Sequence, residues 1–171
     1  MYLASERLLF RPYDDHDFAF LHSLLSDPEE VRFISTGKTR DEKGAKQFLN
    51  WIYGSYKLGS DLGLMVLARK KDHVKIGHAG LVPQTVDGVR EIEIGYWIAR
   101  EHWNNGYATE AAGMLLHYGQ THCGINRFIA LIQNGNTASQ KVAEKIGMKC
   151  EKEITLTGKR VSVYSIESKQ K

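Results

Sequence analysis

The chain is 171 residues long, 42% hydrophobic and 25% charged, which is typical of one globular domain spanning residues 1–171. Its formal net charge of +3, without a dense basic stripe, argues against a protein that binds nucleic acid. Two cysteines are too few for a disulfide framework, and no apolar run reaches the ~18 residues of a membrane span. With no recognisable signal peptide, we expect a cytoplasmic protein with reduced thiols and no membrane contact.

The first elements in chain order are a strand and two helices. Residues 7–11 form the first expected strand, after which Asp14 caps a helix that ends at residues 27–28. Thr39 and Glu42 have the spacing of a capping box and predict the start of the second helix. One apolar face then recurs at helical spacing and comprises Ala45, Phe48, Leu49, Ile52, Tyr53 and Tyr56.

Three strands are expected next, at residues 64–68, 74–82 and 91–98. Turn-forming residues separate them at 71–72 and at 87–88, where Asp is followed by Gly. Short connections of this kind join antiparallel neighbours, so the pattern predicts hairpins or a meander.

The last part of the chain alternates between helices and strands. We expect a helix at 108–122, a buried strand at 127–132, a short helix at 136–146, and two strands around a turn at 157–158. The strand–helix–strand unit implies that 127–132 is parallel to 91–98, or splayed from it, within a mostly antiparallel sheet. The expected fold is therefore α+β, a mixed α/β domain with a twisted sheet and about four helices on its faces.

The connection between strand 91–98 and the following helix has the composition of an anion site. It places Gly106 and Ala108 at alternate positions where the helix begins. Backbone N–H groups at a helix start lack partners, and small residues let a phosphate approach them closely. The chain has neither the GK[ST] ending of a phosphate loop nor a GxGxxG fingerprint, and tight packing of strand against helix would explain the small residues equally well.

Residues 93–112, EIGYWIAREHWNNGYATEAA, resemble motif A of the GNAT acetyltransferase superfamily. The branch most similar to them contains the RimJ/RimL-type ribosomal-protein N-terminal acetyltransferases. Gly106 and Ala108 match the superfamily pattern Gln/Arg-x-x-Gly-x-Gly/Ala, whereas Trp103 stands at its first position and removes one side-chain contact to phosphate. Three further segments resemble the same family in the same order, namely residues 5–12, 26–31 and 136–148.

The resemblance implies a GNAT-like fold and acetyl-CoA as the acyl donor. The 7 histidines show no metal-ligand spacing, so no metal is expected. In that family the strand before the loop binds the pantetheine arm, and the loop binds the pyrophosphate. The backbone of Trp97 and Ile98 is expected to pair with the pantetheine amides and to supply the oxyanion donor. The expected cofactor-binding residues are Trp97, Ile98, Trp103, Asn104, Asn105, Gly106, Tyr107, Ala108, Thr109 and Asn136.

Glu93 is the expected general base. By alternation it shares one face of its strand with Gly95 and Trp97, while Ile92, Ile94, Tyr96 and Ile98 share the other. In the family a Glu at this position is a frequent base, acting directly or through water. A structural Glu paired with Arg or Lys is the alternative, and Glu91, on the same face, is the second candidate base.

Ser139 is the expected group on the leaving-group side. In the RimL-type branch the Ser of the NxxS motif is proposed to hydrogen-bond the CoA sulfur and to donate a proton. Many other members of the superfamily place a Tyr four residues later, where this chain has Ala143. The alternatives are that the Ser139 hydroxyl only bonds backbone and that Asn136 only caps the short helix.

The resemblance implies direct attack of a primary amine on the thioester in a ternary complex. The acceptor stays open between a peptide N-terminus, a polyamine, an amino acid and an aminoglycoside, with Phe33, Tyr53 and Tyr56 as candidates for lining its pocket. Either a monomer or a homodimer is compatible with the sequence. The alternative function is a non-catalytic acyl-CoA sensor or interaction module on the same fold.

Overall fold

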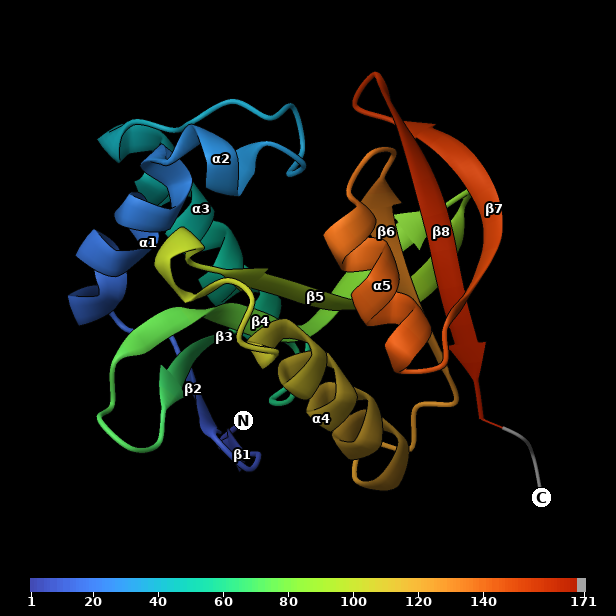
Figure 1. Ribbon diagram of the computed structural model, residues 1–171, viewed down its shortest axis with the longest axis horizontal. Helices are drawn as coiled ribbons and strands as arrows, with labels where there is room; N and C mark the ends of the chain where they lie inside the picture. Colours follow the sequence, from blue (N-terminus) through green and yellow to red (C-terminus); the bar gives the residue numbers. More distant parts are fainter. Residues whose placement is uncertain (169–171) are drawn as a thin grey trace.

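The computed structural model describes residues 1–168, and within them eight strands form one twisted sheet with helices on both faces (Figure 1). Their order across the sheet is β1-β2-β3-β4-β5-β6-β8-β7. The strands are β1 (Leu3–Ala4), β2 (Leu8–Pro12), β3 (Gly63–Arg69), β4 (Lys75–Val86), β5 (Val89–Ile98), β6 (Arg127–Gln133), β7 (Lys149–Leu156) and β8 (Lys159–Glu167). The helices are α1 (Phe18–Ser26), α2 (Pro28–Val31), α3 (Glu42–Tyr56), α4 (Tyr107–Thr121) and α5 (Thr137–Lys145).

A gap opens in the middle of this sheet, between β5 and β6. The two strands are parallel and are in register at one position, where Glu93 faces Ile129. Beyond that point β5 stays paired with β4 as far as Ile98, and β6 stays paired with β8 as far as Gln133. The strands therefore diverge after Glu93, which confirms the expected splayed parallel pair in an otherwise antiparallel sheet.

The two faces of β5 pack against different helices. Ile94 and Ile98 lie in a core with the apolar side of α4, to which α5 contributes Ala143. Trp97 lies in a second core with buried residues of α1 and α3. The alternation of side chains along β5, expected from the sequence, thus separates an α4/α5 side of the gap from an α1/α3 side.

The start of α3 differs from the sequence expectation. Asp41 is its N-cap, and its carboxylate accepts a hydrogen bond from the backbone N–H of Gly44 at 2.8 Å. The predicted capping box between Thr39 and Glu42 is therefore wrong. An Asp directly before the first helical residue satisfies an N–H of the first turn by itself and ranks above Thr as a cap.

Asp41→Ala is expected to lower the free energy of unfolding by about 1 kcal/mol, because an N–H group of the first turn of α3 loses its partner. Thr39→Ala is the matched control and should change stability by only a few tenths of that amount, as is usual for surface substitutions. Urea denaturation of both variants measures the difference. A larger loss for Thr39→Ala than for Asp41→Ala would contradict the capping assigned here.

The remaining differences from the expected elements are local. The short strand β1 and the one-turn helix α2 were not expected, and β4 extends four residues further than predicted, to Val86. Asp27 ends α1 as expected, but its side chain also accepts from the N–H of Glu29 at 2.9 Å and so begins α2. Within the described residues, none of the helices has the length and apolar character needed to cross a membrane.

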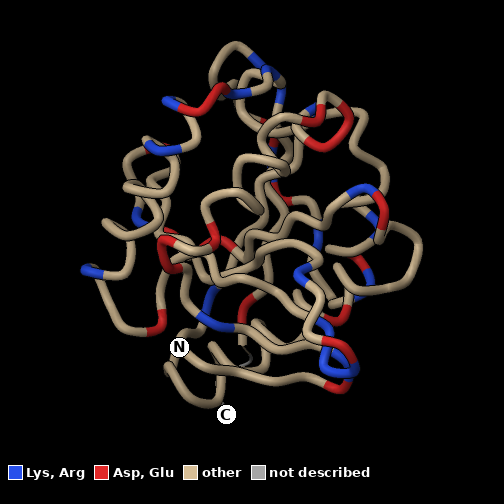
Figure 2. Tube along the Cα trace, turned by 90° about the vertical axis from the view of Figure 1, so that its left-hand side faces the viewer, with Lys and Arg blue, Asp and Glu red and all other residues tan. Residues whose placement is uncertain are grey.

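Charged positions of both signs are interspersed along the chain trace (Figure 2). One acidic side chain, Asp17, is completely buried, and its carboxylate lies 2.7 Å from Arg11 and 2.6 Å from Lys75. Burial alone would raise the pKa of Asp17, but the hydrogen bonds from these two cations hold it well below its usual range. This cluster ties β2 and β4 to the start of α1, away from the gap.

Candidate active site

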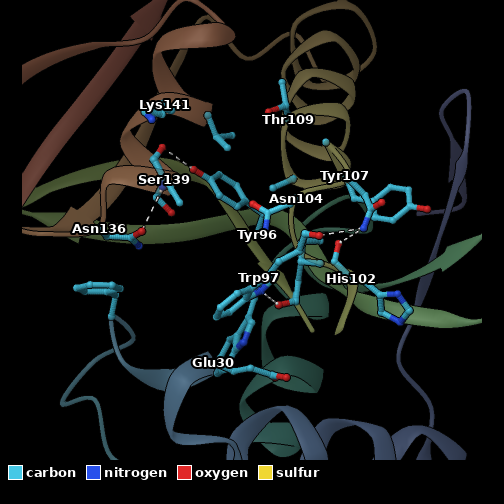
Figure 3. Close-up of a pocket in the computed structure, with 18 of the residues that line it drawn as sticks. Glu30, Tyr96, Trp97, His102, Asn104, Tyr107, Thr109, Asn136, Ser139 and Lys141 are labelled. Atoms are coloured by element: carbon cyan, nitrogen blue, oxygen red, sulfur yellow. Dashed lines mark hydrogen bonds between the residues drawn. The ribbon is translucent and has the colours of Figure 1, made fainter. Parts of the chain in front are cut away.

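A cavity of about 520 Å³ lies beside the end of β5, where β5 diverges from β6 (Figure 3). Three parts of the chain surround it: α2 with the loop after it, the end of β5 with the connection to α4, and the first turns of α5. The sequence-predicted residues that line this cavity are Trp97, Ile98, Trp103, Asn104, Asn105, Gly106, Tyr107, Ala108, Thr109, Asn136 and Ser139. Segments that are distant in the sequence thus meet where the resemblance expects the acyl donor.

The backbone groups that face the gap belong to alternate residues of β5. The N–H of Ala99 donates to the carbonyl of Ile76 on β4 at 2.8 Å. In an antiparallel ladder the paired residues alternate, so Trp97 also turns its backbone toward β4, whereas Tyr96 and Ile98 turn theirs toward β6. This alternation favours the backbone of Tyr96, rather than that of Trp97, for the expected contact with the pantetheine amides. The carbonyl of Ile98 accepts a hydrogen bond from the indole N–H of Trp103 at 2.7 Å. The backbone N–H of Ile98 is left facing the gap.

The N-terminus of α4 is open toward the cavity. Gly106 is the N-cap, has φ +78, and provides no side-chain cap. The first-turn N–H groups of Tyr107, Ala108 and Thr109 therefore have no capping side chain, and the positive end of the helix dipole adds to their attraction for an anion. Asn105 fastens the loop before them, because its amide donates to the carbonyls of His102 and Trp103 at 3.0 and 2.9 Å.

Arg7 holds this loop from outside the cavity. Its Nε lies 2.6 Å from Glu110 of α4, its Nη1 donates to the Asn105 carbonyl at 2.9 Å, and its guanidinium lies 4.6 Å from the centre of the Tyr107 ring. Burial alone would raise the pKa of Glu110, but hydrogen bonds from Ser5 and Arg7 keep it below the usual value. The sequence showed Arg7 only as part of a family-like segment, and its role in bracing the loop is visible in the structure alone.

Arg7→Met is expected to raise the KM for acetyl-CoA by about tenfold, because the anion-binding loop loses its brace, while kcat changes little. Steady-state kinetics at saturating acceptor measure both parameters. Arg90→Met, which removes the same charge from an exposed position in the β4–β5 hairpin, serves as the control. Equal changes in KM for the two variants would show that overall charge, and not the brace, is responsible.

Glu93 lies at the point where the strands part, and it does not line the cavity. Its carboxylate accepts from the Gln84 amide at 2.7 Å and from the Leu131 N–H at 3.4 Å, and no Lys or Arg pairs with it within residues 1–168. Burial raises the pKa of Glu93 above its usual value. A raised pKa makes a carboxylate a stronger proton acceptor, and the role of Glu93 as a base stays a prediction.

Glu91, the second candidate base, has a structural role. Its carboxylate accepts from Nε and Nη2 of Arg127 at 3.0–3.1 Å. The same guanidinium also binds Glu151 at 2.9 Å and Glu167 at 3.0 Å, so that it joins β5, β6, β7 and β8. Glu91 is therefore ion-paired within the sheet, and it does not line the cavity.

Ser139 lies at the α5 edge of the cavity, beside a tyrosine that the sequence did not single out. Asn136 caps α5 by accepting from the Ser139 N–H at 3.2 Å, and the Tyr96 hydroxyl donates to the Ser139 carbonyl at 3.1 Å (Figure 3). Burial raises the pKa of Tyr96 to about 12, so its hydroxyl keeps its proton at neutral pH. In the sequence, Tyr96 is the one residue other than isoleucine on its face of strand 91–98, and this pattern could have identified it.

Five charged residues also line the cavity that sequence reasoning missed: Glu29 and Glu30 of α2, Arg32 directly after it, and Lys141 and Lys145 of α5. The two lysines lie one helical turn apart, and spacing alone could have placed them on one face of α5. Glu30 accepts from the Arg100 N–H at 2.9 Å, and burial raises the pKa of its carboxyl group. The surroundings of Glu30 include this contact with Arg100, 70 residues further along the chain. No local sequence pattern predicts such a contact.

Of the three aromatic residues considered for the acceptor pocket, Phe33 lines the cavity and the two tyrosines do not. The Tyr53 hydroxyl donates to Asp15 at 2.7 Å. The Tyr56 hydroxyl bonds the Leu64 carbonyl and accepts from the Tyr13 N–H. Tyr53 and Tyr56 therefore fasten α3 to its surroundings. Within residues 1–168, no group of three or more His, Cys, Asp or Glu side chains is arranged to hold a metal ion.

Comparison with known proteins matches residues 7–149 to the acetyltransferase (GNAT) domain family. The uncharacterized protein YkkB of Bacillus subtilis (strain 168) is 38% identical over 167 residues, which cover 97% of this chain and 95% of YkkB. A solved GNAT-family acetyltransferase from Bacillus anthracis has a TM-score of 0.83 at 28% identity, covering 99% of this chain and 100% of that chain. RimJ of Mycobacterium smegmatis in complex with CoA-disulfide shares the fold, with a TM-score of 0.80 at 18% identity over 97% of this chain and 86% of that chain.

Proposed function

The chain belongs to the GNAT acetyltransferase family and is an acyltransferase, and we propose that it transfers the acetyl group of acetyl-CoA to a primary amine in a ternary complex. The family match confirms the resemblance predicted from residues 93–112, and RimJ is among its structural neighbours. The observation that carries the proposal is the uncapped N-terminus of α4 at the mouth of the gap between two diverging strands. A cytoplasmic setting, where acetyl-CoA is available, is part of the same proposal.

The acyl donor is assigned to the α4/α5 side of the gap. The N–H groups at the start of α4 suit its diphosphate, and Lys141 and Lys145 add positive charge on the facing helix. The backbone of Tyr96 and Ile98 faces the gap and suits the amides of the pantetheine arm. Asn136 and Ser139 lie at the same side, next to the proposed path of that arm.

The proposed reaction needs one proton acceptor and one oxyanion donor. The acceptor amine has a reference pKa of about 8 to 10.4 and must lose a proton before its nitrogen bonds the thioester carbon. We assign that proton to Glu93, through an intervening water because Glu93 does not line the cavity. The N–H groups of Tyr96 and Ile98 are the candidates for stabilising the oxyanion. When the carbon–sulfur bond breaks, Ser139 is assigned to hydrogen-bond the departing thiolate, which takes up the second proton that the amine nitrogen loses as the amide forms.

Two measurements test the proposal. Acetyl-CoA should raise the melting temperature more than an adenine nucleotide of equal charge, since the gap also receives the pantetheine arm. Thiol release from acetyl-CoA should then depend on an added amine in a panel of peptides, polyamines, amino acids and aminoglycosides. Tight binding without release on any amine would favour the acyl-CoA sensor, and absence of binding would refute the site itself.

A further inference from the structure

Unpaired polar atoms of the protein gather around the cavity. Within residues 1–168, the buried side-chain nitrogen and oxygen atoms without a hydrogen-bond partner are Oε2 of Glu30, Nε1 of Trp97 and Nε2 of His102. All three residues line the same cavity. Buried polar atoms are normally paired, because leaving one unpaired costs about 1–3 kcal/mol. A concentration of such atoms in one place is expected where a ligand supplies the missing partners.

Glu30 and Trp97 lie on the side of the gap opposite the proposed acyl-donor site. Trp97 packs in the core of α1 and α3, and Glu30 belongs to α2, which follows α1 directly. The open start of α4 belongs to the other core, together with Ile98. Figure 3 shows Glu30 and Trp97 at one end of the cavity, with Ser139 and Thr109 toward the other. An acceptor entering opposite the acyl donor would therefore meet Glu30 and Trp97.

The unpaired atoms of Glu30 and Trp97 need hydrogen-bond partners of opposite kinds, a donor for Glu30 and an acceptor for Trp97. One oxygen of Glu30 is held by the Arg100 N–H, and the second, which can only accept, needs a donor. Arg100, which lies 3.8 Å from Asp27, and Arg32 in the cavity lining offset part of the negative charge nearby. An ammonium group supplies the N–H donor that the second Glu30 oxygen needs, together with the opposite charge. Trp97 is 7% exposed, and its indole N–H can only donate, so it needs an oxygen or another acceptor from the ligand.

We propose that Glu30 and Trp97 select the acceptor, and that the preferred acceptor carries a hydrogen-bond-accepting oxygen close to its ammonium group. The ammonium binds Glu30, and the oxygen accepts from Trp97. Amino carbonyl compounds and amino alcohols satisfy both residues, whereas a plain polyamine satisfies only Glu30. The inference rests on the proposed function, since it names the substrate class of the same site.

Binding to the protein saturated with CoA tests this without requiring turnover. The probes are alaninamide and 3-methyl-2-butylamine, in which an isopropyl group replaces the carboxamide. Calorimetry on the wild-type protein should give about tenfold tighter binding of alaninamide, the usual effect of one well-placed hydrogen bond. Glu30→Gln should weaken both amines by about tenfold, because each loses its charge partner. Trp97→Phe should remove the preference for alaninamide and leave the other amine unchanged.

Glu6→Gln is the charge-matched control, because Glu6 is exposed and does not line the cavity, and an exposed carboxylate contributes little. Melting temperatures verify that each variant is folded. If Trp97→Phe is unfolded, the comparison of Glu30→Gln with the wild type still tests the inference. Equal binding by wild type and Glu30→Gln, or an equal loss in Glu6→Gln, would overturn the inference. Selective binding with no acetyl transfer would instead overturn the proposed function, and transfer without selectivity would overturn the inference alone.

Discussion

Glu93→Gln is expected to lower kcat by about 10²–10⁴-fold, the usual contribution of a general base, while the affinity for acetyl-CoA stays unchanged. The amide has the size of the carboxylate and can keep a hydrogen bond with Gln84 or with the Leu131 N–H, but it cannot take a proton at neutral pH. Stopped-flow or steady-state thiol release measures kcat, and calorimetry measures the affinity. Retention of kcat in this variant would remove Glu93 from the mechanism.

The pH profile gives an independent check on the same residue. Burial raises the pKa of Glu93, so the acidic limb of kcat should lie above the ordinary glutamate value of about 4.3. Activity should fall as the pH drops through that limb, because protonated Glu93 cannot accept the proton of the amine, and the limb should be absent in Glu93→Gln. Glu91→Gln is the matched control. It should lower stability through its partner Arg127 and leave the limb in place.

Gly106→Asp is expected to weaken acetyl-CoA binding by about 100-fold, because a carboxylate would stand where the first turn of α4 attracts the diphosphate. Little clash with protein is involved, since a Cβ at this position would meet only Nη2 of Arg7 at 3.5 Å. The positive φ of +78 adds strain that any side chain would share. Calorimetric titration with acetyl-CoA measures the loss.

Gly158→Asp is the control for that variant. Gly158 has φ +75 in the β7–β8 turn and open space around it, so the substitution adds the same charge and similar strain far from the cavity. It should bind acetyl-CoA like the wild type. If both variants lost affinity equally, the charge of the whole protein and not the α4 terminus would govern binding.

The long periodic segments were predictable from the sequence, because an amphipathic helix or a buried strand leaves its period in the chain itself. The helix at 107–121 and the strand at 127–133 begin and end within one residue of expectation. Short elements were not predictable in this way. Helix α2 has four residues, too few to show a period, and its cap Asp27 was interpreted only as the end of α1. At the start of α3, both Thr39 and Asp41 are residue types that cap helices, and Asp41, which is nearer the first turn, is the N-cap.

The composition of the cavity was predictable where one stretch of chain supplies it. The loop of Asn104 to Thr109 carries its own signal, the small residues at a helix start. The choice between the backbones of Tyr96 and Trp97 depends on how β5 registers with β4, which is a property of the folded sheet. Glu30 and Arg7 meet their partners across long stretches of chain, at Arg100 and Glu110. Such contacts follow from the topology and leave no local trace in the sequence.

The most direct measurement is a crystal structure of the protein with acetyl-CoA. We expect the diphosphate against the N–H groups of Tyr107, Ala108 and Thr109, and the pantetheine arm between β5 and β6 beside Tyr96 and Ile98. Density for the ligand elsewhere, or strands β5 and β6 closed against each other with those N–H groups bonded to protein, would contradict the assignment of this cavity as the active site.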